Sequence, residues 1–295
     1  MAKQTKQHRI VTEREGHILQ AAYTYRFATL AQLTRLYFSP RSINHVGEYT
    51  KRLTEDGFLA RFPLPSISRG NHEFVYTLAT KGMKYMATLG QEIAQAYPPG
   101  MPPPSYQHIN HTLAVNDVLI AATLLAQQHP AIELRNLQSE WMLKRTPLSV
   151  TLTSGNGQEK LTVIADGWLD MRFRLRNHTY QTAIWLEVDR GTEEQPQFRR
   201  RVRGLYAVIA SNVCQEQFGA VSPVIAFLTT AGDARCSAMR TWVEQELTAL
   251  QKQDDAEVFL LGTLPQETLD PEALFLRSGC VTPFLSSPCP LIDLS

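Results

Sequence analysis

Residues 42–62, SINHVGEYTKRLTEDGFLARF, decide how the N-terminal part of this chain folds. Their apolar side chains recur at the spacing of one helix face. That set is Ile43, Val46, Tyr49 (or Thr50) and Leu53. Gly57 comes next and favours a helix end, because glycine adopts left-handed backbone without steric cost. The apolar run FLARFPL then predicts a strand, so the stretch predicts a helix that passes through a glycine into a strand.

The flanking residues predict a compact helical unit around this stretch. A helix is expected over 12–25, where Thr12 and Glu15 form a capping box, and another over 29–38, ended by Ser39-Pro40. Downstream, a polar turn at 66–72 leads to a strand at 73–78 and a helix at 79–90. The order helix, helix, helix, hairpin, helix is typical of a winged helix-turn-helix.

The charge of this unit favours a polyanionic partner. Residues 1–90 contain 13 Lys and Arg against 6 Asp and Glu, a net charge of +7, although the whole chain carries only +1. Side chains suited to base edges and phosphates lie on the polar side of the third helix and in the turn. We expect double-stranded DNA to contact Arg41, Ser42, Asn44, His45, Lys51, Arg52, Arg69, Asn71 and His72. A solvated helix face, or a protein-interaction adaptor, is the alternative.

The rest of the chain predicts a second domain. A Pro-rich segment, 95–107, separates a winged helix-turn-helix at 9–94 from a domain at 108–262, and 263–295 forms a loosely structured or packed-on tail. The second domain begins with a long apolar helix over 109–128. Strands are expected over 132–143, 160–166 and 182–188, then a basic helix over 196–211. A strand at 223–229, a helix at 234–252 and a strand at 257–261 complete the domain.

Acidic side chains mark the ends of two expected strands. Asp166 ends one, and Glu187 and Asp189 lie in the stretch LEVDRGTE. Carboxylates that meet at strand ends can bind Mg²⁺, which can activate water against a phosphodiester. We therefore consider these three residues as metal ligands. The alternative is structural: Asp166 opens a turn before Gly167, and Asp189 pairs with Arg190.

Other residues bear less on function. His111 is expected to cap the long helix or to pack beneath the sheet, and it does not share a helix face with Asp117. The four cysteines lack metal-ligand spacing and are expected to be reduced thiols. The polar, basic N-terminus and the lack of an eighteen-residue apolar run predict a cytoplasmic protein without a membrane span.

The chain resembles the replication-relaxation family of plasmids and integrative elements over roughly residues 10–230. The residues that carry the resemblance are His111-Thr-Leu-Ala-Val-Asn-Asp117, Ile164-Ala-Asp-Gly167 and, most specifically, Leu186-Glu-Val-Asp-Arg-Gly-Thr-Glu193. The expected fold is a mixed α+β and α/β one: a winged helix-turn-helix followed by a restriction-endonuclease-like, PD-(D/E)XK domain of αβββαβ order. The resemblance implies a DNA-handling role in plasmid replication, relaxation or mobilisation. It also implies that His111 approaches the acidic residues from the long helix.

The sequence departs from an active nuclease of that fold at one position. Such enzymes usually carry Lys two residues after the Glu, and here that residue is Asp189. A cation could instead come from the basic helix, where Arg201 and its neighbours cluster, or those arginines could clamp phosphates. We therefore expect a DNA-binding protein with a degenerate nuclease-like domain, in which a homodimer and a replication or transfer protein are possible partners. The alternatives are a Mg²⁺-dependent endonuclease, with Asp166, Glu187, Asp189 and Arg201 in its site, and the adaptor.

Overall fold

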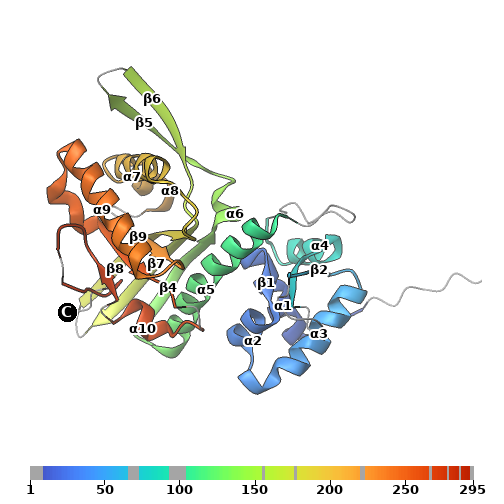
Figure 1. Cartoon of the computed structure of the whole chain (residues 1–295). Helices are drawn as coiled ribbons and strands as arrows, with labels where there is room; N and C mark the ends of the chain where they lie inside the picture. Colours follow the sequence, from blue (N-terminus) through green and yellow to red (C-terminus); the bar gives the residue numbers. More distant parts are fainter. Residues whose placement is uncertain are drawn as a thin grey trace, which may run out of the picture. The chain divides into compact units, whose positions relative to one another are not determined.

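The computed structural model divides the chain into two compact units, Met1–Ile109 and Asn110–Ser295 (Figure 1). The structure describes residues 9–65, 73–92, 104–154, 157–175, 178–219, 223–265, 268–277, 279–285 and 287–292. Three expected DNA contacts in the hairpin turn, Arg69, Asn71 and His72, lie outside the described residues, as does most of the Pro-rich segment.

The first unit contains every helix and strand that the sequence predicts. Its elements are α1 (Glu13–Tyr25), β1 (Ala28–Thr29), α2 (Leu30–Tyr37), the 3₁₀ turn η1 (Pro40–Ser42), α3 (Ile43–Glu55), β2 (Leu59–Pro63), β3 (Phe74–Leu78) and α4 (Thr80–Thr88). The short strand β1 was not predicted. It pairs with β3 and makes the hairpin part of a three-stranded sheet of order β1-β3-β2.

Helix α3 buries one face and exposes the other. Val46, Thr50 and Leu53 are buried, as the apolar spacing predicts. Ile43 is 41 % exposed, so its expected inward position is wrong; it is the first residue of the helix and follows the turn η1. Gly57 has a φ of 77°, the left-handed conformation expected just beyond the helix end.

The second unit is a mixed α/β structure. Its elements are α5 (Tyr106–Gln128), β4 (Ile132–Ser139), α6 (Glu140–Leu143), β5 (Leu148–Ser154), β6 (Gly157–Val163), β7 (Gly167–Leu175), β8 (His178–Asp189), α7 (Gln195–Ile209), α8 (Val213–Phe218), β9 (Val224–Thr229), α9 (Asp233–Leu250), η2 (Gln253–Val258), β10 (Phe259–Thr263), α10 (Pro271–Phe275) and β11 (Cys280–Val281). The first residues of α5 fall within the first unit.

A six-stranded sheet of order β11-β10-β9-β8-β7-β4 forms the centre of this unit. Strands β8, β9 and β10 are parallel, and β4, β7 and β8 are successively antiparallel. Helices α7 and α9 pack on one face, where Trp185, Phe198 and Phe227 belong to one buried apolar cluster. Helix α5 packs on the sheet at Gly167, where a Cβ atom would lie 3.0 Å from Leu119.

The structure corrects two of the expected strands. Residues 160–166 do not enter the six-stranded sheet, because β6 pairs with β5 in a separate hairpin that projects from the unit (Figure 1). The central strand in that position is β7, which was not predicted because charged residues interrupt its apolar pattern. Two of them find partners across the sheet: Arg172 lies 3.4 Å from Glu133, and Asp170 lies 3.4 Å from Arg135. Residues 140–143 form helix α6 and not the end of a strand.

The described part of the C-terminal segment is packed onto the second unit. Phe275, Leu291 and Ile292 are buried, and β11 pairs with β10. Of the two expectations for this tail, packing is the one that the described residues show.

Helix α5 is long and apolar enough to cross a membrane by length and composition alone. Within the folded chain, 61 % of its most apolar window is buried, which is the behaviour of a core helix against a sheet. The expectation of no membrane partner stays a prediction.

Candidate functional site

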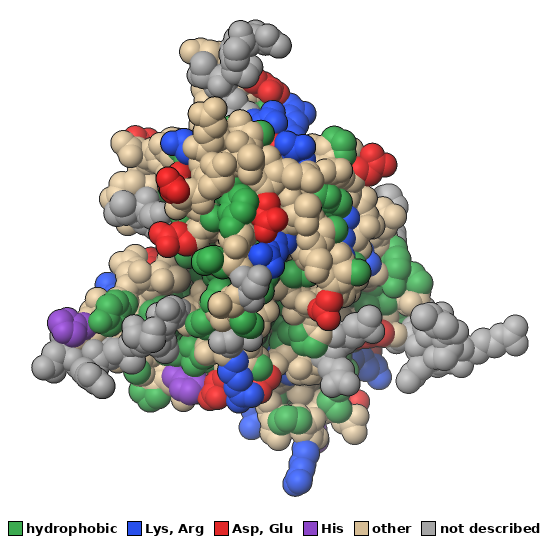
Figure 2. All heavy atoms as spheres, turned by 60° about the vertical axis from the view of Figure 1, so that its left-hand side comes forward, with side chains coloured by type: hydrophobic (Ala, Val, Ile, Leu, Met, Phe, Trp, Pro, Cys, Tyr) green, Lys and Arg blue, Asp and Glu red, His purple; other side chains and the backbone are tan. Residues whose placement is uncertain are grey.

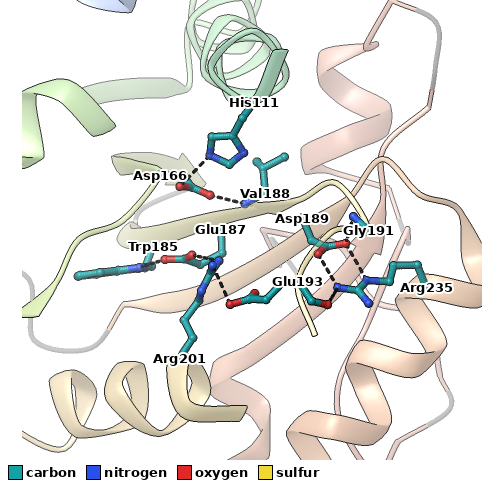
Figure 3. Close-up of polar contacts among 10 residues, drawn as sticks. All are labelled: His111, Asp166, Trp185, Glu187, Val188, Asp189, Gly191, Glu193, Arg201 and Arg235. Atoms are coloured by element: carbon teal, nitrogen blue, oxygen red, sulfur yellow. Dashed lines mark hydrogen bonds and ion pairs between the residues drawn. The ribbon is translucent and has the colours of Figure 1, made fainter. Parts of the chain in front are cut away.

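Strand register brings Asp166 beside Glu187. Gly167 pairs with Leu186 across β7 and β8, and the Asp166 N–H donates to the Leu186 carbonyl oxygen at 3.1 Å. The Asp166 carboxylate accepts a hydrogen bond from the Val188 N–H at 2.7 Å (Figure 3). Asp166 therefore holds the β8 backbone on both sides of Glu187, so two of the three expected acids lie together.

The Glu187 carboxylate is buried between a tryptophan and an arginine. Side chains alternate along a strand, so Glu187 lies on the same side of β8 as Trp185, toward α7. The Trp185 indole donates to Glu187 Oε1 at 2.7 Å, and Arg201 of α7 donates to Oε2 at 3.0 Å. A second nitrogen of Arg201 donates to Glu193 at 3.0 Å (Figure 3). One guanidinium thus bridges two carboxylates.

Burial dominates the electrostatics of these acids. It raises the pKa of Glu187 to about 8, and the nearby charge of Asp166 adds to the rise, against the opposing effects of Arg201 and the Trp185 indole. Burial also raises the pKa of Glu193. Burial lowers the pKa of Arg201, but the surrounding carboxylates outweigh it and the net shift is upward.

His111 reaches the acidic residues from helix α5. Its Nε2 lies 3.0 Å from Asp166 Oδ1. This is the approach to the acidic residues that the family resemblance implied, and the helix-cap interpretation did not predict it. Burial lowers the pKa of His111, but the hydrogen bond and charge of Asp166 outweigh it, so the net shift is upward. The residue after Asp166, Gly167, lets α5 pack closely here, because a Cβ atom at that position would lie 3.0 Å from the Leu119 side chain.

Asp189 does not join the other two acids. It accepts hydrogen bonds from Arg235 of α9 at 2.9 and 2.8 Å and from the Gly191 N–H (Figure 3). The Thr229 hydroxyl donates a further hydrogen bond to it. The structure therefore brings two of the three proposed metal ligands together and places the third, Asp189, against Arg235. No local pattern in the sequence points to Arg235, which lies 46 residues away in the next βα unit.

The described residues fit a divalent cation poorly. Among them, no three His, Cys, Asp or Glu side chains are grouped to hold a metal ion. Asp166, Glu187 and Arg201 line an open pocket of about 650 Å³ between α7 and the base of the β5–β6 hairpin, with Lys160 and Arg200. Arg201 therefore contacts Glu187 directly, and the charge of Asp166 acts on the same guanidinium.

The comparison with protein families covers this site. The family model described as replication-relaxation matches residues 19–224. This range includes most of the first unit and the acidic pair, Asp166 and Glu187. The chain belongs to the replication-relaxation family. This membership associates it with replication or relaxation on plasmids and other mobile elements. Neither a curated protein nor a solved structure gives a significant match to the chain.

The other arginines of the basic helix in this replication-relaxation protein have structural partners. Arg199 and Arg203 of α7 bind opposite oxygens of Glu246 of α9 at 2.9 and 2.7 Å, and Glu246 is fully buried. Arg200 pairs with Glu159 of β6 at the surface. The expectation that this cluster clamps phosphates therefore does not fit Arg199 and Arg203, which join two helices.

The expected DNA-contacting residues of the first unit are at its surface. Arg41, Asn44, His45, Lys51 and Arg52 are exposed, and Ser42 is half-buried. The Arg52 guanidinium lies over the Tyr49 ring, 5.0 Å from its centroid. A pocket of about 320 Å³ lies beside them and is lined by Ser42, His45 and Tyr49 of this segment and by residues of α1 and α2.

Proposed function

We propose that this replication-relaxation protein binds double-stranded DNA through α3, acting in the replication, relaxation or mobilisation of a mobile element. The observation that carries the proposal is the two-sided character of α3. Its apolar side is buried, and its other side exposes Asn44, His45, Lys51 and Arg52 to solvent. Asparagine and arginine can pair with adenine and guanine edges, and lysine suits phosphates.

The arrangement around α3 supports a winged helix-turn-helix. Helix α2 and helix α3 are joined by the short turn η1, and the hairpin β2–β3 follows α3 and is joined to β1. In that motif the second helix of the pair enters the major groove and the hairpin lies on the backbone. The exposed segment from Arg41 to Arg52 carries three cations against the single acid Glu48, which favours DNA over the adaptor alternative.

One face of the second unit does not favour DNA. On the face drawn in Figure 2, which brings forward the side of α9, basic and acidic side chains lie interspersed. We assign DNA contact to the first unit on the basis of the exposed side of α3. The order α5, β4, β7, β8, α7, β9 supports a nuclease-like core for the second unit, which we propose serves dimerisation or recruitment of a replication or transfer protein.

Duplex binding is tested by fluorescence polarisation of a labelled DNA duplex titrated with the full chain at low salt. We expect saturable binding that weakens steeply as salt rises, because released counterions drive the association. An unchanged polarisation at low salt would remove DNA binding and leave the adaptor.

Endonuclease activity is the second candidate, and the nuclease-like strand order together with the contact of Asp166 and His111 favours it. Incubation of supercoiled plasmid with the protein and Mg²⁺ or Mn²⁺ tests it. We expect no nicking. Nicking that Glu187→Ala abolishes would establish the endonuclease instead.

A further inference from the structure

Two carboxylates side by side at a nuclease-like site ordinarily require a cation. In water-poor surroundings, adjacent carboxylates repel each other, and a metal ion, a proton or a basic side chain must compensate their charge. Asp166 and Glu187 form such a pair, and Glu193 is close to the same arginine. The question for this chain is which group supplies the positive charge.

We infer that the Arg201 guanidinium occupies the place of a divalent cation at the acidic pair, so that the site is closed to metal by a residue of its own chain. The inference rests on the proposed nuclease-like fold of the second unit. It concerns the Asp166, Glu187 and Arg201 site and makes no use of DNA binding by α3.

The geometry of Arg201 matches the role of an internal cation. Its two terminal nitrogens lie 3.0 Å from Glu187 and 3.0 Å from Glu193, so one planar group neutralises two acids from different segments. A guanidinium keeps its charge at every physiological pH and presents its donors in a fixed fork. An ion that approached Glu187 would therefore meet a fixed positive charge and an oxygen already engaged as an acceptor.

The other acids around this place in the described part of the chain already have partners: Glu140, which also lines the pocket, pairs with Lys144. Asp189, the acid two positions further along β8, is fully engaged by Arg235, Gly191 and Thr229. The second Glu187 oxygen accepts from Trp185, and the Asp166 oxygens accept from His111 or the β8 backbone. Each carboxylate oxygen of the pair therefore has a partner within the chain.

Arg201 is distinct from its neighbours on the helix, which provides a control. Arg200 also lines the pocket, but its partner is the exposed Glu159 of β6. Removing Arg201 leaves Glu187 and Glu193 without their shared cation, whereas removing Arg200 changes only a surface pair. Arg200→Ala and Arg201→Ala each remove one positive charge from adjacent positions of α7, so Arg200→Ala is the matched control.

The experiment titrates Mn²⁺ into chelator-treated, metal-free full-length protein at pH 8.5 and follows the free Mn²⁺ signal by electron paramagnetic resonance. We expect no stoichiometric binding to the wild type or to Arg200→Ala. Arg201→Ala is expected to bind one Mn²⁺ per chain, at least about tenfold more tightly than the wild type. Adding Glu187→Gln to Arg201→Ala should abolish that binding.

Two results would overturn the inference. One is stoichiometric Mn²⁺ binding by the wild type that Glu187→Gln removes. The other is a folded Arg201→Ala protein, judged by circular dichroism and a cooperative thermal transition, that binds no more Mn²⁺ than the wild type. If Arg201→Ala does not fold, Arg201→Met carries the same test, because it retains an apolar stem for packing.

Failure of this inference and failure of the proposed function are distinguishable. Duplex binding is measured on the wild type and does not involve the acidic pair, so it is expected to be equal in wild type and Arg201→Ala. Metal binding by the wild type would leave DNA binding by α3 intact. Loss of duplex binding by the wild type would leave the Mn²⁺ result standing.

Discussion

The carboxylate of Asp189 lies against the guanidinium of Arg235 in a two-pronged ion pair, with N–O distances of 2.9 and 2.8 Å. Both side chains are mostly buried, 4 % and 15 % exposed, so this pair ties the end of β8 to α9. Removing one partner leaves the other charge uncompensated in the interior. Arg235→Ala is therefore expected to lower the free energy of unfolding by about 3 kcal/mol in a urea titration. A loss below about 0.5 kcal/mol, the size of an exposed pair, would contradict the assignment.

Acid should weaken the Asp189 pair in a defined window. Burial alone would raise the pKa of Asp189, but Arg235 and two further hydrogen bonds outweigh it and hold that pKa below its ordinary 3.8. A carboxyl with a lowered folded pKa stabilises the fold above pH 3.8, and this stabilisation is lost as pH falls through the folded pKa. Asp189→Asn should be less stable than the wild type at pH 7, and the difference should shrink below pH 3.8. The unfolding free energies of both proteins are measured by urea titration. If the gap between Asp189→Asn and the wild type is the same at pH 7 and well below pH 3.8, the linkage is refuted.

A glycine on α4 sets the packing of the first unit. A Cβ atom at Gly82 would lie 2.2 Å from the backbone oxygen of Phe58, so Gly82→Ala forces α4 away from the chain that leads into β2. We expect a loss of about 1–3 kcal/mol in unfolding free energy, measured by thermal or urea denaturation. Gly16→Ala in α1 is the matched control, because its nearest neighbour would be 3.7 Å away. It should be neutral or stabilise by up to about 1 kcal/mol; an equal loss in both variants would exclude the proposed clash.

Loss of the buried acid Glu246 should lower the free energy of unfolding far more than loss of the exposed acid Glu159. Both acids pair with arginines of α7. Glu246 is buried and binds Arg199 and Arg203, so Glu246→Gln is expected to cost about 3 kcal/mol. Glu159 pairs with Arg200, and both side chains are more than half exposed. Glu159→Gln should therefore cost less than about 1 kcal/mol in the same urea titration. If the two variants lose similar amounts of unfolding free energy, burial does not decide how much the pairs between α7 and α9 stabilise the fold.

The sequence predicted the first unit well because its signals are local. Thr12 and Thr29 each cap the helix that follows them, and Gly57 ends α3. Strand β7 was missed because its charged residues find their partners on neighbouring strands. Asp170 and Arg172 meet residues of β4 more than thirty positions earlier, and Asp170 also accepts from Gln181 of β8. The pairing of Asp189 was missed for the same reason: local spacing puts it near Glu187, but a partner on α9 decides its place. The position of Asp166 beside Glu187 follows from strand register, and no spacing along the chain encodes that register.

The salt dependence of duplex binding tests the central claim most directly. Each phosphate contact that is lost lowers the slope of log K against log salt concentration by about one. We compare Lys51→Ala on the exposed side of α3 with Lys84→Ala, which removes the same charge from the exposed surface of α4. DNA binding by α3 predicts weaker binding and a smaller slope for Lys51→Ala, with Lys84→Ala equal to the wild type. Equal affinities and slopes for Lys51→Ala and the wild type, or an effect confined to Lys84→Ala, would contradict it.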